Sequence, residues 1–196
     1  INNTSVRATL TNVNAGNLLA AFPIDLPGRL RDFNGSTSGT VELTGLPNES
    51  QGSIDIAAAN GSVGGQAFDS LKAKAVFAGT RIEIETAEIR VGEGFVTVKG
   101  SYDRASTSFD LDLTGRSVPL PLALTFLPES DSIPSITGTA DVTAKATGFG
   151  NRTSTFNVSF EGKAVDVVIN ENSFGEVTFK GNTVGQKLFA DLTARL

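Results

Sequence analysis

Carboxylates are the residues in this sequence whose type and spacing could do chemistry. The chain has no histidine and no cysteine, so the Ser-His-Asp and Cys-His nucleophilic systems are excluded. Zinc, haem and iron sites built on histidine or cysteine are excluded as well. Calcium or magnesium binding and acid–base pairs of the glycosidase type remain. The candidate carboxylates are Glu83, Glu85, Glu88, Glu93, Asp110, Asp112 and Asp141.

Most of these carboxylates alternate with apolar residues. The spacing Glu83-x-Glu85 puts two of them on the same face of one strand. The acidic stretch at Glu129 and Asp131 lacks the glycine and the final glutamate of a calcium loop. This pattern favours a polar outer face over a catalytic or metal site. We therefore expect a protein that is not an enzyme and holds no cofactor and no metal.

Two glycine-rich stretches, 61–65 and 92–94, are candidates for phosphate-binding loops. Neither has the strand–helix context of a dinucleotide site, and no Gly-Lys-Ser/Thr follows them. Glycine-rich pieces between alternating segments are typical of hairpins. Both are predicted to be hairpin turns.

Charge argues against nucleic-acid binding, and hydropathy argues against a membrane-spanning helix. The net charge is −5 and lysine and arginine form no cluster, whereas nucleic-acid binding needs a basic stripe. No run of about 18 apolar residues is present, and there is no signal peptide. Because the sequence begins at Ile1, we expect a piece of a larger protein whose anchor and targeting signal lie elsewhere. The absence of cysteine fits an oxidising compartment such as the periplasm.

The dominant signal is strict alternation of apolar and polar residues. Val41 and Leu43, for example, alternate with Glu42 and Thr44. Alternation with period two is typical of half-buried antiparallel strands. The apolar members of this series are predicted to line one groove: Val41, Leu43, Ile54, Ile56, Leu71, Phe77, Ile82, Ile84, Val96, Val98, Phe109, Leu111, Leu113, Val142, Phe156, Val158, Phe160, Val177, Phe179, Leu188 and Leu192.

Short turn signals separate the alternating segments, which predicts a meander of about a dozen strands. A flat open sheet seldom holds that many strands without curling. The fold class is therefore predicted to be all-β, a curled antiparallel meander forming an open, taco-like groove. The turn signals are Pro47-Asn48, Asn60-Gly61, Ala78-Gly79, 92–94, Gly100, 148–150, 170–172 and Gly181.

Two leucine-rich stretches break the alternation. Residues 14–22 and 117–127 each end before a proline and predict one or two short apolar helices. Asn14 and Ser117 are the expected N-caps. Prolines at 119 and 121 weaken the case for the second helix.

The sequence also contains a loose internal repeat. Residues 38–44 align with 137–143 at an offset of 99, and 67–71 have a counterpart in 173–177. Fixed self-similarity points to a stacked array in which each unit contacts its neighbours. We expect residues 1–196 to form one β-groove segment made of two repeats, 1–100 and 101–196.

Many of the predicted inward positions are alanines. A closed sandwich fills its core with interlocking large side chains, whereas a curled sheet lined by small residues leaves a furrow. Each methylene of a lipid tail buried there gains about 0.8 kcal/mol. The alternative interpretation of these alanines is an ordinary sheet core in which they lie beneath helices. The alanines are Ala57 or Ala58, Ala73, Ala75, Ala140, Ala144, Ala146, Ala190 and Ala194.

Three stretches carry a resemblance to a known family: Gly-Thr-Val-Glu-Leu-Thr-Gly at 39–45, the segment 60–71 and the segment 89–100. Together they resemble the repeating unit of the TamB/AsmA-like family. The resemblance implies a protein anchored in the inner membrane that crosses the periplasm. It implies antiparallel strands curled into an open groove with an apolar interior, similar to bridge-like lipid transfer proteins. It also implies a link to phospholipid movement and to outer-membrane protein assembly.

The expected function is a periplasmic segment whose hydrophobic groove shields lipid acyl chains during phospholipid transport between the inner and outer membranes. Its expected partners are those acyl chains, an outer-membrane barrel partner bound through other parts of the parent protein, and outer-membrane protein clients. The alternative is an interaction module that assists outer-membrane protein assembly by pairing its strand edges with client strands. A β-solenoid adhesin or polysaccharide lyase is disfavoured. The coils of a solenoid repeat every 20–30 residues or so, whereas the repeat in this sequence has an offset of 99 residues.

Overall fold

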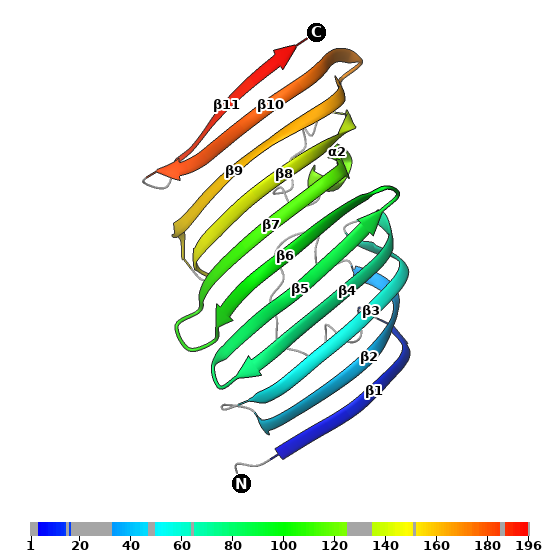
Figure 1. Cartoon of the computed structure of the whole chain (residues 1–196), viewed down its shortest axis with the longest axis vertical. Coiled ribbons are helices and arrows are strands. Elements are labelled where there is room, and N and C mark those ends of the chain that lie inside the picture. The colour runs from blue at the N-terminus through cyan, green and yellow to red at the C-terminus, as the bar shows by residue number, and fades with distance from the viewer. Residues whose placement is uncertain are drawn as a thin grey trace.

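The computed structural model is one sheet of eleven strands that follow each other in sequence order. It describes residues 4–14, 16, 33–46, 50–63, 65–124, 135–150, 152–184 and 187–195. Figure 1 shows the strands side by side from N- to C-terminus. The elements are β1 (Thr4–Asn14), β2 (Phe33–Leu46), β3 (Gln51–Val63), β4 (Gln66–Ala78), β5 (Arg81–Val91), β6 (Gly94–Asp103), β7 (Ser108–Pro119), α2 (Leu120–Leu124), β8 (Ile136–Phe149), β9 (Arg152–Ile169), β10 (Asn172–Val184) and β11 (Lys187–Arg195).

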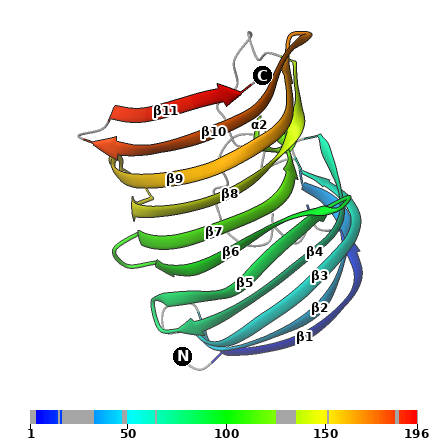
Figure 2. The same cartoon turned by 45° about the horizontal axis from the view of Figure 1, so that its top comes forward.

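The predicted fold class is confirmed. Every neighbouring pair of strands is antiparallel, and in the part of the chain that the structure describes β1 and β11 are the two open edges. Figure 2 shows the strands arching together, so that the sheet is curled and not flat. One short helix, α2, packs against β7 and β8.

Bulges near one side of the sheet produce part of this curl. Register shifts occur beside Asn12 in β1, Gly35 in β2, Ser117 in β7 and Gly138 in β8, and each of these residues has a positive φ. A bulge inserts an extra residue into one strand, bends it and increases its twist. The bulge at Ser117 is held by its backbone N–H, which donates to Asp141 Oδ1 at 2.8 Å. The strands therefore turn at these positions without losing their neighbours.

The predicted helix at 117–127 is corrected by the structure. β7 continues to Pro119, which pairs with Thr139, so Ser117 is a strand bulge and not an N-cap. Only Leu120–Leu124 is described as helical. Asn14 likewise belongs to β1 and is not a helix cap. Of the rest of the predicted helix at 14–22, only Gly16 is described, in a helical state, and the other residues lie outside the described ranges.

Several predicted turns are also corrected. The signals at 78–79, 92–94 and 170–172 do mark turns, and the turn near 148–150 falls on Gly150. Asn60-Gly61, Gly100 and Gly181, in contrast, lie inside β3, β6 and β10. The glycine stretch 61–65 is strand as far as Val63, and Gly65 is its described turn residue. Pro47-Asn48 lies outside the described ranges.

Several glycines within the strands have phenylalanine rings lying across them, which leaves no room for a side chain. A β-carbon on Gly181 would be 2.5 Å from Phe160 Cζ, and one on Gly162 would be 2.5 Å from Phe179 Cζ. Gly148 is covered in the same way by Phe156, whose Cδ1 would be 2.8 Å away. Aromatic rings that cover glycines on a neighbouring strand are a known device for stabilising curved sheets. Glycine and phenylalanine therefore act as one packing unit here.

Replacing a covered glycine is expected to destabilise the sheet. Gly162→Ala places its methyl group 2.5 Å from both Phe179 Cζ and Asp141 O, so overpacking is expected to cost about 1–3 kcal/mol. Urea unfolding followed by circular dichroism measures this change. The control is Gly150→Ala, whose β-carbon has no neighbour closer than 3.6 Å and is expected to change stability by less than about 0.5 kcal/mol. Equal stability of the two variants would contradict the packing role.

A second local interaction holds the turn between β6 and β7. Asp103 accepts hydrogen bonds from the Ser106 backbone N–H at 2.7 Å, from Thr80 Oγ1 at 2.7 Å and from Ser106 Oγ at 2.8 Å. Donors that favour the charged carboxylate, first of all the Ser106 backbone N–H, lower the pKa of Asp103 to about 2.

Acid is expected to weaken this turn fully only when the pH falls to about 2. Because the folded-state pKa of Asp103 lies below its unfolded value, its contribution to stability is complete above the unfolded pKa of about 3.9. That contribution disappears as the pH falls through about 2. Carboxyl chemical shifts followed by NMR would report the pKa of Asp103 directly. A midpoint near 4 would show that the three hydrogen bonds are not formed in solution.

Candidate functional site

One face of the sheet carries continuous apolar rows that run across the strands. Residues opposite each other in register share a face of the sheet, so the register traces each row from strand to strand. Two rows cross all eleven strands without interruption. The first is Leu10, Gly39, Ile56, Ala73, Ala87, Val98, Leu113, Ala144, Phe160, Gly181 and Ala190. The second is Val13, Thr37, Ala58, Leu71, Ile89, Val96, Gly115, Val142, Gly162, Phe179 and Leu192.

Two further rows lie on the same face. One is Ala8, Val41, Ile54, Ala75, Ile84, Gly100, Leu111, Ala146 and Val158. The other is Val6, Leu43, Gly52, Phe77, Ile82, Tyr102, Phe109 and Gly148, and it reaches Phe156, whose ring meets that of Phe109 edge-on at 5.1 Å. We call the face that carries these four rows the inner face.

The inner face includes every residue that the alternation predicted for the groove. Val177 lies there too, between Ala164 and Ala194, and Leu188 lies opposite Thr183. The alternation did not decide which of Ala57 and Ala58 faces inward. In the structure Ala58 is inward and buried, whereas Ala57 is outward and exposed. The structure thus brings the predicted residues together on one surface.

Several inner-face residues were not predicted from the sequence to line the groove. Leu10, Ile89 and Tyr102 belong to the rows but were not among the residues predicted to line it. Leu10 and Ile89 continue an alternating series in their own strands. Tyr102 follows Gly100, which was assigned to a turn, so extending the alternation through the glycine would have found it.

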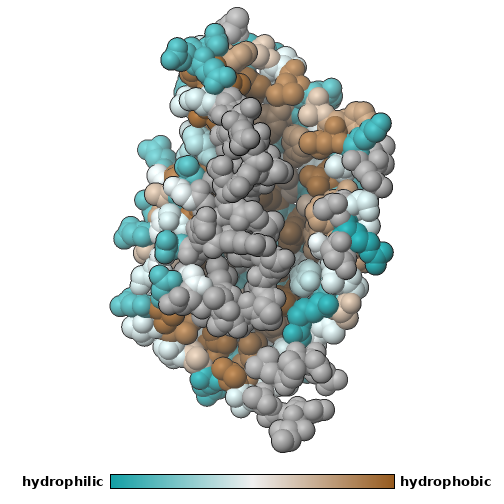
Figure 3. All heavy atoms as spheres, turned by 180° about the vertical axis from the view of Figure 1, so that it is seen from behind, coloured by the Kyte–Doolittle hydropathy of each residue, from teal (hydrophilic) through white to brown (hydrophobic). Residues whose placement is uncertain are grey.

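None of the four rows contains an aspartate, glutamate, lysine or arginine. Their polar side chains are the hydroxyls of Thr37 and Tyr102. Figure 3, which views the molecule from behind, shows apolar side chains gathered on that side of the molecule. This face can therefore accept an apolar ligand, and among the residues in the rows no charge would hold a polar group.

One part of the apolar face packs against α2. Leu122 of α2 is buried in a cluster with Val96, Val118 and Phe68, and Leu120 packs against a second cluster around Ala140 and Ala164. Away from α2 burial varies along the rows: Ala75 and Ala146 are half-buried, whereas Val41 and Leu43 are buried. The alternative reading, alanines beneath a helix, applies to the α2 end of the face. The remaining rows are not explained by that helix.

Six of the seven candidate carboxylates lie on the opposite, outer face, and the seventh, Glu93, lies in the turn between β5 and β6. Lys145 Nζ sits 3.2 Å from Asp110 Oδ1 and 3.5 Å from Asp112 Oδ1. Hydrogen bonding to Asp110, with the charges of both carboxylates, raises the pKa of Lys145. Lys74 pairs with Glu85 at 2.7 Å, which raises the pKa of Lys74. Arg81 and Arg90 pair with Glu83 and Glu88. These side chains are solvated, and ion pairs of this kind contribute little to stability.

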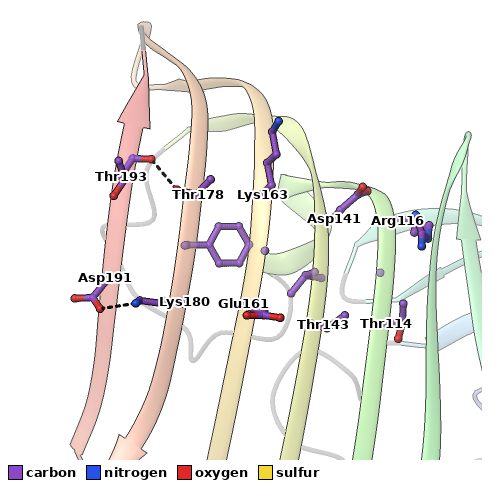
Figure 4. Close-up of a pocket in the computed structure, with 14 residues that line it drawn as sticks. Thr114, Arg116, Asp141, Thr143, Glu161, Lys163, Thr178, Lys180, Asp191 and Thr193 are labelled. Atoms are coloured by element: carbon purple, nitrogen blue, oxygen red, sulfur yellow. Dashed lines mark hydrogen bonds and ion pairs between the residues drawn. The ribbon is translucent and has the colours of Figure 1, made fainter.

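A hollow of about 640 Å³ also lies on the outer face, across β7 to β11. Figure 4 shows its polar lining, in which Lys180 faces Asp191 and Thr178 faces Thr193. Lys163 pairs with Glu176 at 2.8 Å, and Asp141 accepts the Ser117 N–H. Because these charges are already paired and the hollow is open to water, we regard the inner face as the better candidate site despite the hollow's volume.

The described residues also bear on metal binding and on membrane insertion. Among those that the structure describes, no three His, Cys, Asp or Glu side chains are grouped to hold a metal ion. Within the described ranges, no helix combines the length and the apolar character needed to cross a bilayer.

No protein-family model, curated protein or solved structure matches this chain. The function of this chain is therefore inferred from its residues and their arrangement.

Two variants with one cysteine each test which residues belong to the inner and the outer face. The natural chain has no cysteine, so Ala146→Cys on the inner face and Ser159→Cys on the outer face can each carry one polarity-sensitive fluorophore. The inner probe is expected to emit at shorter wavelength because its surroundings are apolar. Similar emission from the two probes would contradict the separation of faces.

Proposed function

We propose that this chain is a lipid-shielding groove, in which the inner face covers acyl chains while their headgroups remain in water. The observation that carries the proposal is the pair of apolar rows that cross all eleven strands on a curled, open sheet. A conduit depends on that continuity.

The dimensions of the rows suit a lipid tail. Neighbouring strands lie about 4.8 Å apart, so ten junctions between eleven strands give a row of roughly 48 Å. The hydrocarbon core of a bilayer is about 30 Å thick, so one leaflet contributes about 15 Å. An acyl chain therefore fits along the rows with length to spare. Each buried methylene gains about 0.8 kcal/mol wherever it lies.

The chemistry of the rows favours sliding over tight binding. Without a charged side chain in the rows, no strong electrostatic contact holds a particular headgroup at one position. The small residues Gly39, Ala73, Ala87 and Ala144 line one row and leave room for a tail. A tail shifted by one strand meets similar apolar surface, so movement along the groove has low barriers.

In this proposal the chain is a periplasmic segment of a TamB/AsmA-like, inner-membrane-anchored protein that moves phospholipid between the inner and outer membranes. The support is the resemblance of residues 39–45, 60–71 and 89–100 to that family, together with the curled sheet. An outer-membrane barrel partner would bind other parts of the parent protein. The alternative function, strand pairing with outer-membrane protein clients, draws on one observation, the exposed edge at β11.

A charge placed on the inner face is expected to release lipid. Purified protein is examined by native mass spectrometry and then titrated with a fluorescent phospholipid. Val158 lies in an apolar row opposite Ala146, so Val158→Asp puts a carboxylate against the tails at a cost of more than 1 kcal/mol. We expect lipid affinity to fall about tenfold or more, since 1.4 kcal/mol corresponds to a factor of ten.

The matched control is Ser159→Asp, which adds the same charge to the outer face one residue later and is expected to leave affinity unchanged. Circular dichroism must show retained β-structure in both variants. If the unmodified protein carries no lipid and takes none up, or if both variants bind equally, the groove does not serve as a lipid conduit.

A further inference from the structure

We infer that lipid headgroups lie along one rim of the groove, beside Tyr102 and Arg104, and that the preferred headgroup carries a phosphate. This inference rests on the proposed lipid-shielding function and makes it more specific. It assigns the headgroup a side of the sheet and names the residues that meet it.

The two rims of the groove are the two ends of the strands. Alternate turns of an antiparallel meander fall at opposite ends, and Figure 1 shows α2 at the end of β7 that lies opposite the β6–β7 turn. The α2 rim is α2 together with the turns at 92–93 and 170–171. The Arg104 rim is formed by the β4–β5, β6–β7 and β8–β9 turns, with described residues 79–80, 104–107 and 150.

The α2 rim is filled by apolar packing. The buried apolar residues described in β4 to β9 all lie toward this end of their strands, in the two clusters that contain or contact Leu122 and Leu120 of α2. They are Phe68, Val96, Val118, Ala140, Ala164 and Val167. The turns of this rim carry Glu93 and Glu171, both exposed. A phosphate at this rim would therefore meet packed apolar side chains and like charge.

The last inner-face row before the Arg104 rim is aromatic and half-buried. From β4 to β7 it consists of Phe77, Ile82, Tyr102 and Phe109. The other hydroxyl in the four rows belongs to Thr37, which is only 2% exposed and so cannot meet a ligand. Tyrosine is favoured where an apolar region meets water, because its ring packs while its hydroxyl bonds to polar groups. Tyr102 therefore marks the boundary between tails and headgroups.

Arg104 places a cation at this boundary. It follows Tyr102 by two residues, and its half-buried side chain crosses the β4–β5 turn. Nη2 donates to Gly79 O at 2.7 Å and to Ser50 Oγ at 3.2 Å, which fixes the guanidinium on the rim. Guanidinium groups recognise phosphate by charge and by their planar array of donors.

Arg104 is suited to orient a lipid without trapping it. It lies beyond the apolar rows, so a headgroup that it meets is still in water, where contacts between charges are weak and are screened by salt. We expect a phospholipid to bind about threefold to fivefold more tightly than a diacylglycerol with the same tails. A preference of this size leaves the lipid free to slide along the rim.

A phospholipid with a nitroxide on its headgroup locates the headgroup in the unmodified protein. Ile82 and Ile89 are matched reporters, because both are half-buried on the inner face of β5 and they lie roughly 20 Å apart along that strand. We expect the methyl signals of Ile82 to broaden strongly and those of Ile89 to broaden little. Stronger broadening of Ile89 would place the headgroup at the α2 rim, and equal broadening would show no preferred rim; either result overturns the inference.

Arg104→Gln tests the role of the guanidinium, since it removes the charge and keeps an amide that can donate to Gly79 O. Affinity for the phospholipid is expected to fall about threefold to fivefold, while affinity for the diacylglycerol stays unchanged. Arg104→Lys is expected to restore part of the phospholipid affinity. The matched control is Arg81→Gln at the same rim, where Arg81 pairs with Glu83 on the outer face; it is expected to change neither affinity.

Failure of this inference and failure of the groove proposal give different results. If both lipids bind and Arg104→Gln changes neither affinity, the headgroup assignment is wrong and the groove proposal stands. If Arg104→Gln weakens both lipids equally, Arg104 only supports the structure, and its headgroup role is again overturned. If neither lipid binds to the unmodified protein, the groove proposal fails and this inference fails with it.

Discussion

The cross-strand register is the constraint on which the rest of the structure depends. Because side chains alternate between faces, a slip of one residue at a single junction would turn the following strands over. It would bring Glu161 and Lys163 onto the apolar side and Phe160 and Val158 into water. Ten consecutive junctions keep the same faces together, and the separation of apolar and charged surfaces follows from that agreement. Opposite charges on the outer face, such as Lys145 beside Asp110 and Asp112, support the same register.

Curvature is the second requirement, and the sheet meets it by backbone devices and by packing. Bulges at Asn12 and Ser117 bend their strands without ending them. Inner-face glycines such as Gly162 and Gly181 let strands approach while Phe179 and Phe160 cover the exposed backbone. A flat sheet with the same rows would offer an apolar plane. The curl makes that plane a hollow, and α2 closes part of it near β7 and β8.

Much of this arrangement could be predicted from the sequence, because period two is a local signal. Val41, Leu111 and Val158 all fell on the correct face from alternation alone. Glycines were the main source of error: Gly100 and Gly181 look like turn residues, and only the ring or backbone on the next strand explains why they stay within strands. Ser117 failed for a similar reason, since its bulge is held by Asp141 from β8. The exposure of β11 is a tertiary property that no local pattern reports.

The central claim is that acyl chains occupy the inner face and no other surface. A phospholipid carrying a nitroxide on its acyl chain, added to protein with labelled methyl groups, tests it by paramagnetic broadening of NMR signals. If acyl chains lie on the inner face, inner-face methyls such as those of Leu111, Val142 and Val158 are expected to broaden, while the outer-face methyls of Val76 and Val165 stay sharp. Equal broadening on both faces, or none on the inner face, would contradict it.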